Sequence, residues 1–401
     1  MSTGPEHGQA PTMECRVCQT DVPAGQFCGL CGAHLSPQRG NGPDWLRIRA
    51  YGAAPGEHLL TPSVASSLFP HLPQRSRVPF RVGLVVVLAA LVVCALLRLP
   101  AALIAVAALG LPLLFLIYLQ DSDVHRDLPM GTLVLTAALG VGLGVGWVLL
   151  TGAAVARSYG VPLGAGIAGY RMLREGLGVA LGGLILMLVP AVVVRLLRPP
   201  IRESLEGFVI GALGALCFTA AATLTRLAPQ FATGMVARGR PLVSLVVEAG
   251  IRGVAVPLTA AAAGGLIGAL LWFRRPPNKT RQHRGYMRIT LALFAFAVLA
   301  LYAAVGLVDV ARPPQLLQLT LHLLVAAVAL LVLRVGLHLT LLHEEHDEIQ
   351  AGEPLLCPHC GHVVPDMAFC PACGVATRAS SRSSRVARRD SRPVRTEPGD
   401  S

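Results

Sequence analysis

The chain has 401 residues, of which 53% are hydrophobic and 14% are charged. This composition excludes an ordinary soluble domain, in which about a quarter of the residues are charged. The formal net charge is +12, and it comes almost wholly from arginine because Lys279 is the only lysine. In a membrane protein, an arginine excess first indicates how the chain is oriented across the bilayer.

The chain begins with a predicted disordered segment, residues 1–12, and a cysteine-rich module, residues 13–36. The module contains two C-x2-C pairs separated by nine residues: Cys15, Cys18, Cys28 and Cys31. This spacing brings four thiolates to one tetrahedral ion, so it predicts a zinc ribbon. Four cysteine ligands leave no open coordination position, which indicates a structural zinc. Metal-binding thiols also favour a reducing compartment.

Residues 37–79 are rich in Pro, Gly and Ser and predict a linker. Residues 80–342 predict a membrane domain, because about eight apolar runs are long enough to cross a hydrocarbon layer of about 30 Å. The runs are 80–98, 100–119, 130–152, 171–194, 206–227, 250–273, 288–310 and 316–339. The segment 153–170 is mildly apolar, so counts of seven or nine stay open. The predicted fold class is an all-α polytopic membrane bundle with about eight transmembrane helices and two small cytoplasmic zinc-ribbon modules.

Basic residues gather in three groups that an even count of spans places on one side. They are Arg75, Arg77 and Arg81, then Arg195, Arg198 and Arg202, then Arg274, Arg275, Lys279, Arg281, Arg284 and Arg288. The positive-inside rule then places both termini in the cytoplasm, although eight arginines fall on the opposite side. Usage rich in alanine and arginine is typical of a GC-rich bacterial genome. We therefore predict a multi-pass protein of the bacterial inner (cytoplasmic) membrane.

Ionisable residues within the apolar runs are candidates for a site or an interhelical pair, because charge in hydrocarbon is costly. They are Glu175, Glu206, Arg226, Glu248, Arg252, His322, Arg334 and His338. Glu248 and Arg252 are four residues apart and can neutralise each other on one helix face. Most of the others lie near a helix end, from which long side chains reach the interface.

Glycines four residues apart recur along the apolar runs. The pairs are Gly140 with Gly144, Gly142 with Gly146, Gly207 with Gly211, and Gly264 with Gly268. Small residues at this spacing let helix backbones approach closely, so the pattern predicts a tight bundle.

The last apolar run is followed by a polar cluster and a second cysteine-rich module. The cluster, His343 to His346, has its histidines three residues apart, unlike H-E-x-x-H, and we interpret it as a solvated helix end. Residues 353–376 contain Cys357, Cys360, Cys370 and Cys373 in the first module's spacing and predict a second zinc ribbon. Gly32, Gly361 and Gly374 follow knuckle cysteines, where we expect a positive backbone φ. Such small modules depend on their metal for stability.

The segment 377–401 is rich in Arg and Ser and predicts a disordered tail. Attraction of this tail to nucleic acid or anionic lipid is an alternative to a merely solvated tail.

Residues 105–273 contain motifs in an order that resembles the PrsW-type intramembrane metalloproteases. The stretch from Pro112 to Asp121, followed by Asp127-Leu128-Pro129, resembles that family's early helices. The stretch from Leu205 to Ala220 resembles its Asp-Gly-Phe-x-x-Gly to Gly-Phe-Ala span, and the stretch from Arg252 through Pro257 to Gly265 resembles its Arg to Pro-x-x-His to Gly span. The resemblance implies a bundle in which paired glutamates, a further Glu and a His hold a catalytic metal.

The chain departs from that family at each implied ligand. Arg174-Glu175 stands in place of the Glu-Glu pair, Ala221 to Thr223 stand where the further Glu is expected, and Thr259 or Ala260 replaces the histidine. A catalytic metal normally needs about three protein ligands. We therefore assign no catalytic residue and expect a core that has lost catalysis.

Together, these features predict a non-catalytic binding, scaffold or regulatory protein with two structural zinc ions. Its expected partners are membrane lipid and a cytoplasmic protein bound through the ribbons. Two alternatives stay open. One is a PrsW-like protease that uses Glu175, and the other is a transporter that uses Glu248 and Arg252.

Overall fold

The structure is a computed structural model of the full chain. It describes residues 11–36, 64–70, 77–122, 124–158, 178–197, 203–233, 242–274, 283–311, 313–344, 354–357, 359–377 and 380–390. The chain divides into two compact units, which we describe separately. The larger unit comprises residues 62–69 and 75–345, and the smaller one contains both ends of the chain, residues 1–61, 70–74 and 346–401.

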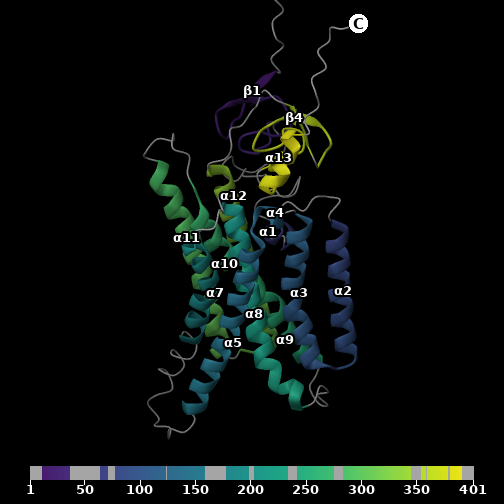
Figure 1. The fold of residues 1–401 in the computed structure, drawn as a ribbon, viewed down its shortest axis with the longest axis vertical. Helices are drawn as coiled ribbons and strands as arrows, with labels where there is room; N and C mark the ends of the chain where they lie inside the picture. The colour runs from purple at the N-terminus through teal and green to yellow at the C-terminus, as the bar shows by residue number, and fades with distance from the viewer. Residues whose placement is uncertain are drawn as a thin grey trace, which may run out of the picture. The chain divides into compact units, whose positions relative to one another are not determined.

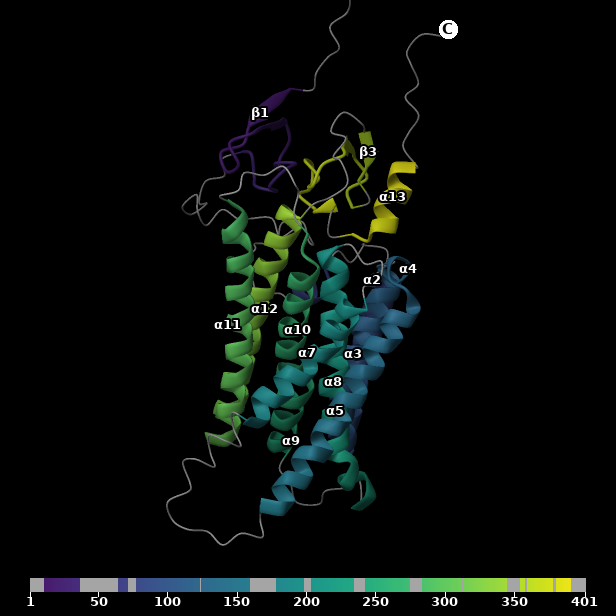
Figure 2. The same cartoon turned by 60° about the vertical axis from the view of Figure 1, so that its left-hand side comes forward.

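The larger unit is a bundle of long helices (Figures 1 and 2). These are α2 (Arg77–Leu96), α3 (Pro100–Asp121), α5 (Met130–Ser158), α7 (Val179–Leu196), α8 (Ser204–Thr233), α9 (Leu242–Ala249), α10 (Val256–Trp272), α11 (His283–Ala311) and α12 (Gln315–His343). A π-helix, η3 (Gly250–Ala255), joins α9 to α10 in one continuous span. Within the described residues, eight helical spans are long and apolar enough to cross a membrane, which confirms the predicted fold class.

The observed spans follow the predicted ones, with two differences. The sixth span begins at Val243 instead of residue 250, because α9 and η3 precede α10. The fourth begins at Val179, and the predicted start at residue 171 lies outside the described residues. Because eight spans alternate in direction, the start of α2 and the end of α12 lie at one end of the bundle. We call this end the terminal face and the opposite end the far face.

Helix α8 forms the core of the bundle and packs on α3, α5, α7 and α10. The tightest crossing joins α8 to α10, where Gly211 and Gly264 leave no room for a Cβ atom on either side because each faces the other's backbone carbonyl. Gly140 and Gly144 of α5 likewise face the α8 backbone, whereas Gly142 and Gly146 have open space beside them. The glycines therefore allow close helix crossings, as predicted, but only one of the two glycine pairs on α5 lies at such a crossing.

Helix α2 shows the opposite pattern, since large apolar side chains cover its surface. Four of these side chains are at least half exposed: Val85, Val86, Leu88 and Val92. In water such a surface would drive aggregation, whereas in a bilayer it is the surface that contacts lipid.

One part of the predicted linker belongs to the bundle. Helix α1 (Val64–Leu68) lies within residues 37–79 but is packed on α12, and its Ser66 hydroxyl accepts a 2.7 Å hydrogen bond from buried Arg334. The next residue after α1, Phe69, packs edge-to-face on Phe80 with ring centroids 4.8 Å apart and is 3% exposed. The prediction of a plain tether is therefore wrong for this segment, which anchors the chain to the terminal face. A second short helix, α4 (Val124–Asp127), joins α3 to α5.

The smaller unit contains two short antiparallel hairpins and a helix. Strands β1 (Thr12–Glu14) and β2 (Asp21–Pro23) form the first hairpin, and β3 (Pro354–Leu356) and β4 (Val363–Pro365) form the second. Helix α13 (Arg382–Asp390) follows the second hairpin, and its Arg389 pairs with Asp366 at 2.9 Å. The prediction of disorder over 377–401 is therefore wrong for α13, and residues 391–401 lie outside the described residues.

Candidate metal centres and membrane cavity

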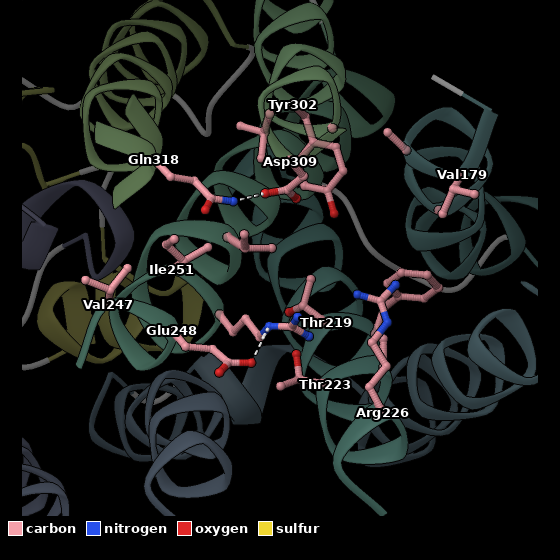
Figure 3. Close-up of a pocket in the computed structure, with 18 of the residues that line it drawn as sticks. Val179, Thr219, Thr223, Arg226, Val247, Glu248, Ile251, Tyr302, Asp309 and Gln318 are labelled. Carbon is pink, nitrogen blue, oxygen red and sulfur yellow. Dashed lines mark hydrogen bonds and ion pairs between the residues drawn. The ribbon is translucent and has the colours of Figure 1, made fainter. Parts of the chain in front are cut away.

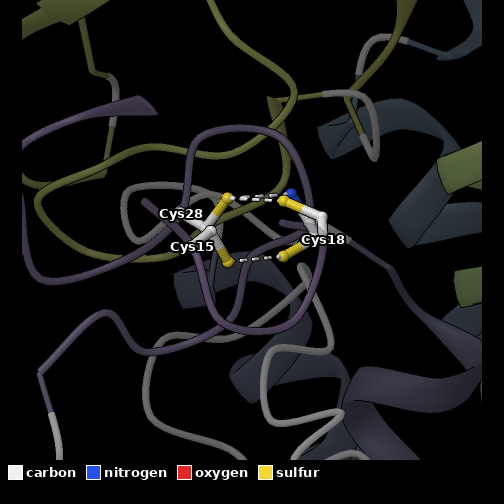
Figure 4. A group of neighbouring side chains, drawn as sticks. Cys15, Cys18 and Cys28 are labelled. Carbon is white, nitrogen blue, oxygen red and sulfur yellow. Dashed lines mark hydrogen bonds between the residues drawn. The ribbon is translucent and has the colours of Figure 1, made fainter. Parts of the chain in front are cut away.

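The four cysteines of the first module converge on one point (Figure 4). The Sγ atoms of Cys15 and Cys31 are 3.6 Å apart, those of Cys18 and Cys28 are 3.7 Å apart, and all four lie within 4.8 Å of one another. A tetrahedral zinc with Zn–S bonds of about 2.3 Å places its sulfurs about 3.8 Å apart. The sulfur positions therefore fit a single tetrahedral ion.

The second module repeats this arrangement. The Sγ atoms of Cys357 and Cys373 are 3.8 Å apart, and those of Cys360 and Cys370 are 3.9 Å apart. Within the described part of the chain, these two sets are the only groups of three or more His, Cys, Asp or Glu side chains close enough to share a metal ion. All eight cysteines predicted as metal ligands are thus brought together, four to a site.

Tight turns hold each pair of cysteines in place. Each turn ends in a residue with positive φ whose N–H donates to the carbonyl of the first cysteine of the pair. Gly32, Gly361 and Gly374 occupy three of these positions, as predicted, and their φ values are 75°, 71° and 74°. Gln19 occupies the fourth at φ 52°, where a residue with a side chain is strained.

In each cluster, hydrogen bonds from neighbouring thiols lower the pKa of one cysteine. The hydrogen bond from the Cys31 thiol lowers the pKa of Cys28 to about 5. In the second cluster, hydrogen bonds from the Cys370 and Cys373 thiols lower the pKa of Cys357 strongly. Such a thiolate is the group that first binds a metal, and the metal then displaces the protons of the other thiols.

The two ribbons pack against each other within the smaller unit through reciprocal contacts. Equivalent residues of the ribbons differ by 342 in number, as Cys15 and Cys357 show. Phe27 N–H donates to the Pro371 carbonyl at 3.0 Å, and its counterpart Phe369 N–H donates to the Gly29 carbonyl at 2.9 Å. Because Gly29 and Pro371 are also counterparts, the interface is self-complementary, like that of a two-fold symmetric dimer.

The same symmetry appears in the side-chain packing. Met367 packs against Gly29 and joins the core around Cys15 and Cys28 of the first ribbon. At the counterpart position, Gly25 faces the backbone and ring of Pro371 so closely that a Cβ atom would lie 2.8 Å from the carbonyl oxygen. The two chain ends therefore build one body, which we call the ribbon head.

The outer surfaces of the two ribbons differ even though their backbones match. In the second ribbon Leu356 and Val363 are paired across the hairpin and are 54% and 58% exposed. In the first ribbon the counterpart pair is Glu14 and Asp21, which are also paired across their hairpin. One ribbon thus presents an apolar pair where the other presents an acidic pair.

The larger unit contains a cavity of about 760 Å³ at the far face (Figure 3). Six of the helical spans line it, counting α9, η3 and α10 as one span. Its polar lining residues come from α8, α9, η3, α11 and α12: Thr219, Thr223, Arg226, Ser244, Glu248, Arg252, Tyr302, Asp309, Gln315 and Gln318. The apolar walls include Trp147, Val179, Phe218 and Val256. This volume is typical of a small-molecule site.

Two polar pairs organise the cavity lining. Arg252 Nε lies 3.3 Å from Glu248 Oε1, as their spacing predicts. Arg252 is held by η3, and single π-helical turns occur frequently at functional sites. On the other side, Asp309 accepts a 2.9 Å hydrogen bond from Gln318 and lies 3.2 Å from His322 Nε2.

The other ionisable residues that the sequence singled out and the structure describes lie apart from this cavity. Glu206 accepts a hydrogen bond from the Glu203 N–H at the start of α8. Arg334 and His338 are buried on α12, toward the terminal face. Glu344 accepts a 2.6 Å hydrogen bond from the Ser204 N–H at the start of α8, so this part of the 343–346 cluster is buried instead of solvated. Glu175 lies outside the described residues.

Apart from Arg174 and Glu175, the positions that depart from the PrsW pattern lie within the described residues. Thr223 lines the cavity, whereas Thr259 is buried and donates to the Ala255 carbonyl of its own helix. The sequence did not predict the cavity, because its lining comes from segments as far apart as residues 147 and 318. The available signal was the pairing of Glu248 with Arg252 inside an apolar run.

Comparisons with known proteins returned no match to any protein-family model, curated protein or solved structure.

Proposed function

We propose that this chain is a bacterial inner-membrane protein whose ribbon head binds two structural zinc ions and a cytoplasmic protein partner. The observation that carries the proposal is the reciprocal pairing of the ribbons through Phe27 and Phe369, which makes one metal-dependent body from both chain ends. Closed four-cysteine sites have no position for a substrate, so binding is the role that such sites support. The arginine distribution supports a cytoplasmic position for the head.

The apolar pair Leu356 and Val363 is the surface that we propose for the partner. Exposed apolar side chains on a small rigid hairpin supply the contacts that dominate protein interfaces. The basic residues of α13 are less available, because Arg389 pairs with Asp366 and Arg388 donates to the Ser380 hydroxyl. This favours a protein partner over nucleic acid or anionic lipid at the tail.

A photo-crosslinking amino acid placed at Val363 in cells should yield one adduct of defined mass. The same reagent at Asp21, the counterpart position in the first ribbon, serves as the matched control and should not yield that adduct. Replacing Cys370 and Cys373 by Ser should abolish the adduct, because the hairpin loses its metal. Absence of an adduct at Val363, or an adduct that survives loss of the metal ligands, would contradict the proposal.

Two alternatives use the membrane domain instead. A PrsW-like protease requires a further metal held by Glu175 and ligands not yet recognised, and a transporter is favoured by the cavity that Glu248 and Arg252 line. Glu248 and Arg252 neutralise each other there, so neither is available as a lone metal ligand or transported charge.

Metal analysis of the purified protein separates the protease from the binding role. We expect two zinc ions per chain in the wild type and none after all eight ribbon cysteines are replaced by Ser, because each ribbon supplies a complete set of four thiolates. Inductively coupled plasma mass spectrometry on the detergent-solubilised protein measures both values. A third ion that survives these replacements would favour the protease.

A further inference from the structure

The cavity at the far face extends from the ends of its helical spans deep into the bundle. Arg226 is three residues from the end of its span at Pro229, or about 5 Å along the helix, and Asp309 and Gln315 mark the ends of theirs. Phe218, eleven residues from the same span end, lies about 16 Å deep, and Val256, thirteen residues from the start of its span at Val243, lies about 20 Å deep. The cavity therefore runs from the level of lipid head groups into the level of the acyl chains.

The first polar pair of the lining carries no net charge. Glu248 and Arg252 form an ion pair at 3.3 Å on consecutive turns of one span. Their charges cancel, and the pair can lie below the head-group level at an acceptable cost.

The second polar pair joins an imidazole to a carboxylate. His322 Nδ1 lies 2.8 Å from the Gln318 carbonyl, which can only accept, so we assign a hydrogen to Nδ1. His322 Nε2 lies 3.2 Å from Asp309 Oδ1, so a protonated His322 forms an ion pair that balances the charge of this carboxylate. Asp309 also accepts the hydrogen bond from Gln318.

Arg226 supplies the remaining charge of the described lining. No described carboxylate lies within salt-bridge distance of its guanidinium, although Asp309 attracts it from farther away. Arg252 repels it within the same cavity. In Figure 3 Arg226 extends from α8 on the same helix face as Thr223, beside the open space. The cavity thus combines apolar walls with one guanidinium that forms no ion pair with a described carboxylate.

We propose that this cavity binds a molecule that carries a phosphate group and an apolar body. The phosphate pairs with Arg226, whose planar fork of donors matches phosphate oxygens, and the Thr223 hydroxyl and Gln315 amide offer further donors at the same level. The apolar body lies against Phe218 and Val256. Two kinds of molecule carry a phosphate of this kind. One is a membrane lipid, in its head group, and the other is a water-soluble phosphate ester.

A lipid is the source that the depth of the cavity favours. Arg226 lies at the depth of the head groups, and the walls below it match an acyl chain in polarity. A water-soluble ester would use the same guanidinium but would leave the deep walls unfilled. Competition by a water-soluble phosphate ester therefore distinguishes the two sources.

Native mass spectrometry of the full-length protein, released from nanodiscs of phosphatidylcholine with a minor fraction of phosphatidylglycerol, tests the proposal. We expect one retained phosphatidylglycerol on the wild type. Arg226→Gln should lower its occupancy on the order of tenfold, because a charge-assisted contact is lost. Arg226→Lys should retain part of it, since the charge remains but the fork does not.

Arg195→Gln is the matched control, because Arg195 stands at the terminal face over the ring of Trp272 and does not line the cavity. It should leave the retained lipid unchanged. Displacement of the lipid by added glycerol phosphate would assign the site to a water-soluble ester, whereas resistance to it assigns the site to lipid. Equal retention by Arg226→Gln and the wild type, or equal loss in Arg195→Gln, would overturn the proposal. Size-exclusion chromatography of each variant confirms that the bundle is folded.

Discussion

Replacing Cys28 and Cys31 by Ser should remove the first zinc and also weaken binding of the second zinc, on the order of tenfold or more. The physical reason is that the second ribbon folds against the first. Three backbone hydrogen bonds cross the interface, from Gln26 and Phe27 to Pro371 and from Phe369 to Gly29. At about 1 kcal/mol net each, their loss removes enough stabilisation for this factor. Competition with a chromogenic chelator measures the affinity.

The coupling must be reciprocal, because it is a free energy shared by both sites. Replacing Cys370 and Cys373 by Ser should therefore weaken the first zinc by the same factor. Gly25→Val is the matched control: it retains all eight ligands but places a Cβ atom against the Pro371 backbone, so the two sites should become independent. Unequal factors, or a second site that is unaffected by loss of the first, would show that the ribbons do not form one head.

Gly211→Leu should destabilise the membrane domain by about 2 kcal/mol or more. The added side chain meets the backbone of Gly264 on α10, which cannot move aside as a flexible side chain would. The closest crossing in the core would open, and helix packing in a bilayer depends on such approaches. Thermal unfolding of the detergent-solubilised protein, followed by loss of the monodisperse peak in size-exclusion chromatography, measures the effect.

Gly142→Leu controls for the general effect of a large side chain at a membrane glycine. Gly142 lies on α5 with no neighbouring atom within 4 Å of an added Cβ, so its replacement should be tolerated. If both variants lose the same stability, close packing of α8 on α10 is not what holds the bundle together.

Local patterns predicted the metal centres and the spans well. The spacing of Cys15, Cys18, Cys28 and Cys31 determines their geometry, because the turn between two cysteines of a pair involves only a few residues. Hydropathy located all eight spans, since crossing a bilayer requires about 20 apolar residues in succession. The start of the sixth span was wrong because the predicted run omitted α9, which contains Glu248 and continues through η3 into α10.

The short anchoring and capping helices were missed because their signals are weak. Helix α1 has only five residues. Ser66 is buried where it accepts the hydrogen bond from Arg334, and the following Phe69 contacts aromatic residues of α2 and α3. Helix α13 is highly polar, and its ordered position depends on the pairing of Arg389 with Asp366. Tertiary contacts override composition in both segments.

The sequence by itself therefore determined which residues form the candidate metal sites, which segments are long and apolar enough to span a membrane and which helices can cross closely, because each property depends on residues near one another in the chain. Only the tertiary structure decided that the ribbons pair through Phe27 and Phe369, 342 residues apart, and that six helical spans line a cavity beside Arg226. Contacts between residues so far apart in the chain depend on how whole helices and hairpins pack. A local sequence pattern contains no information about that packing.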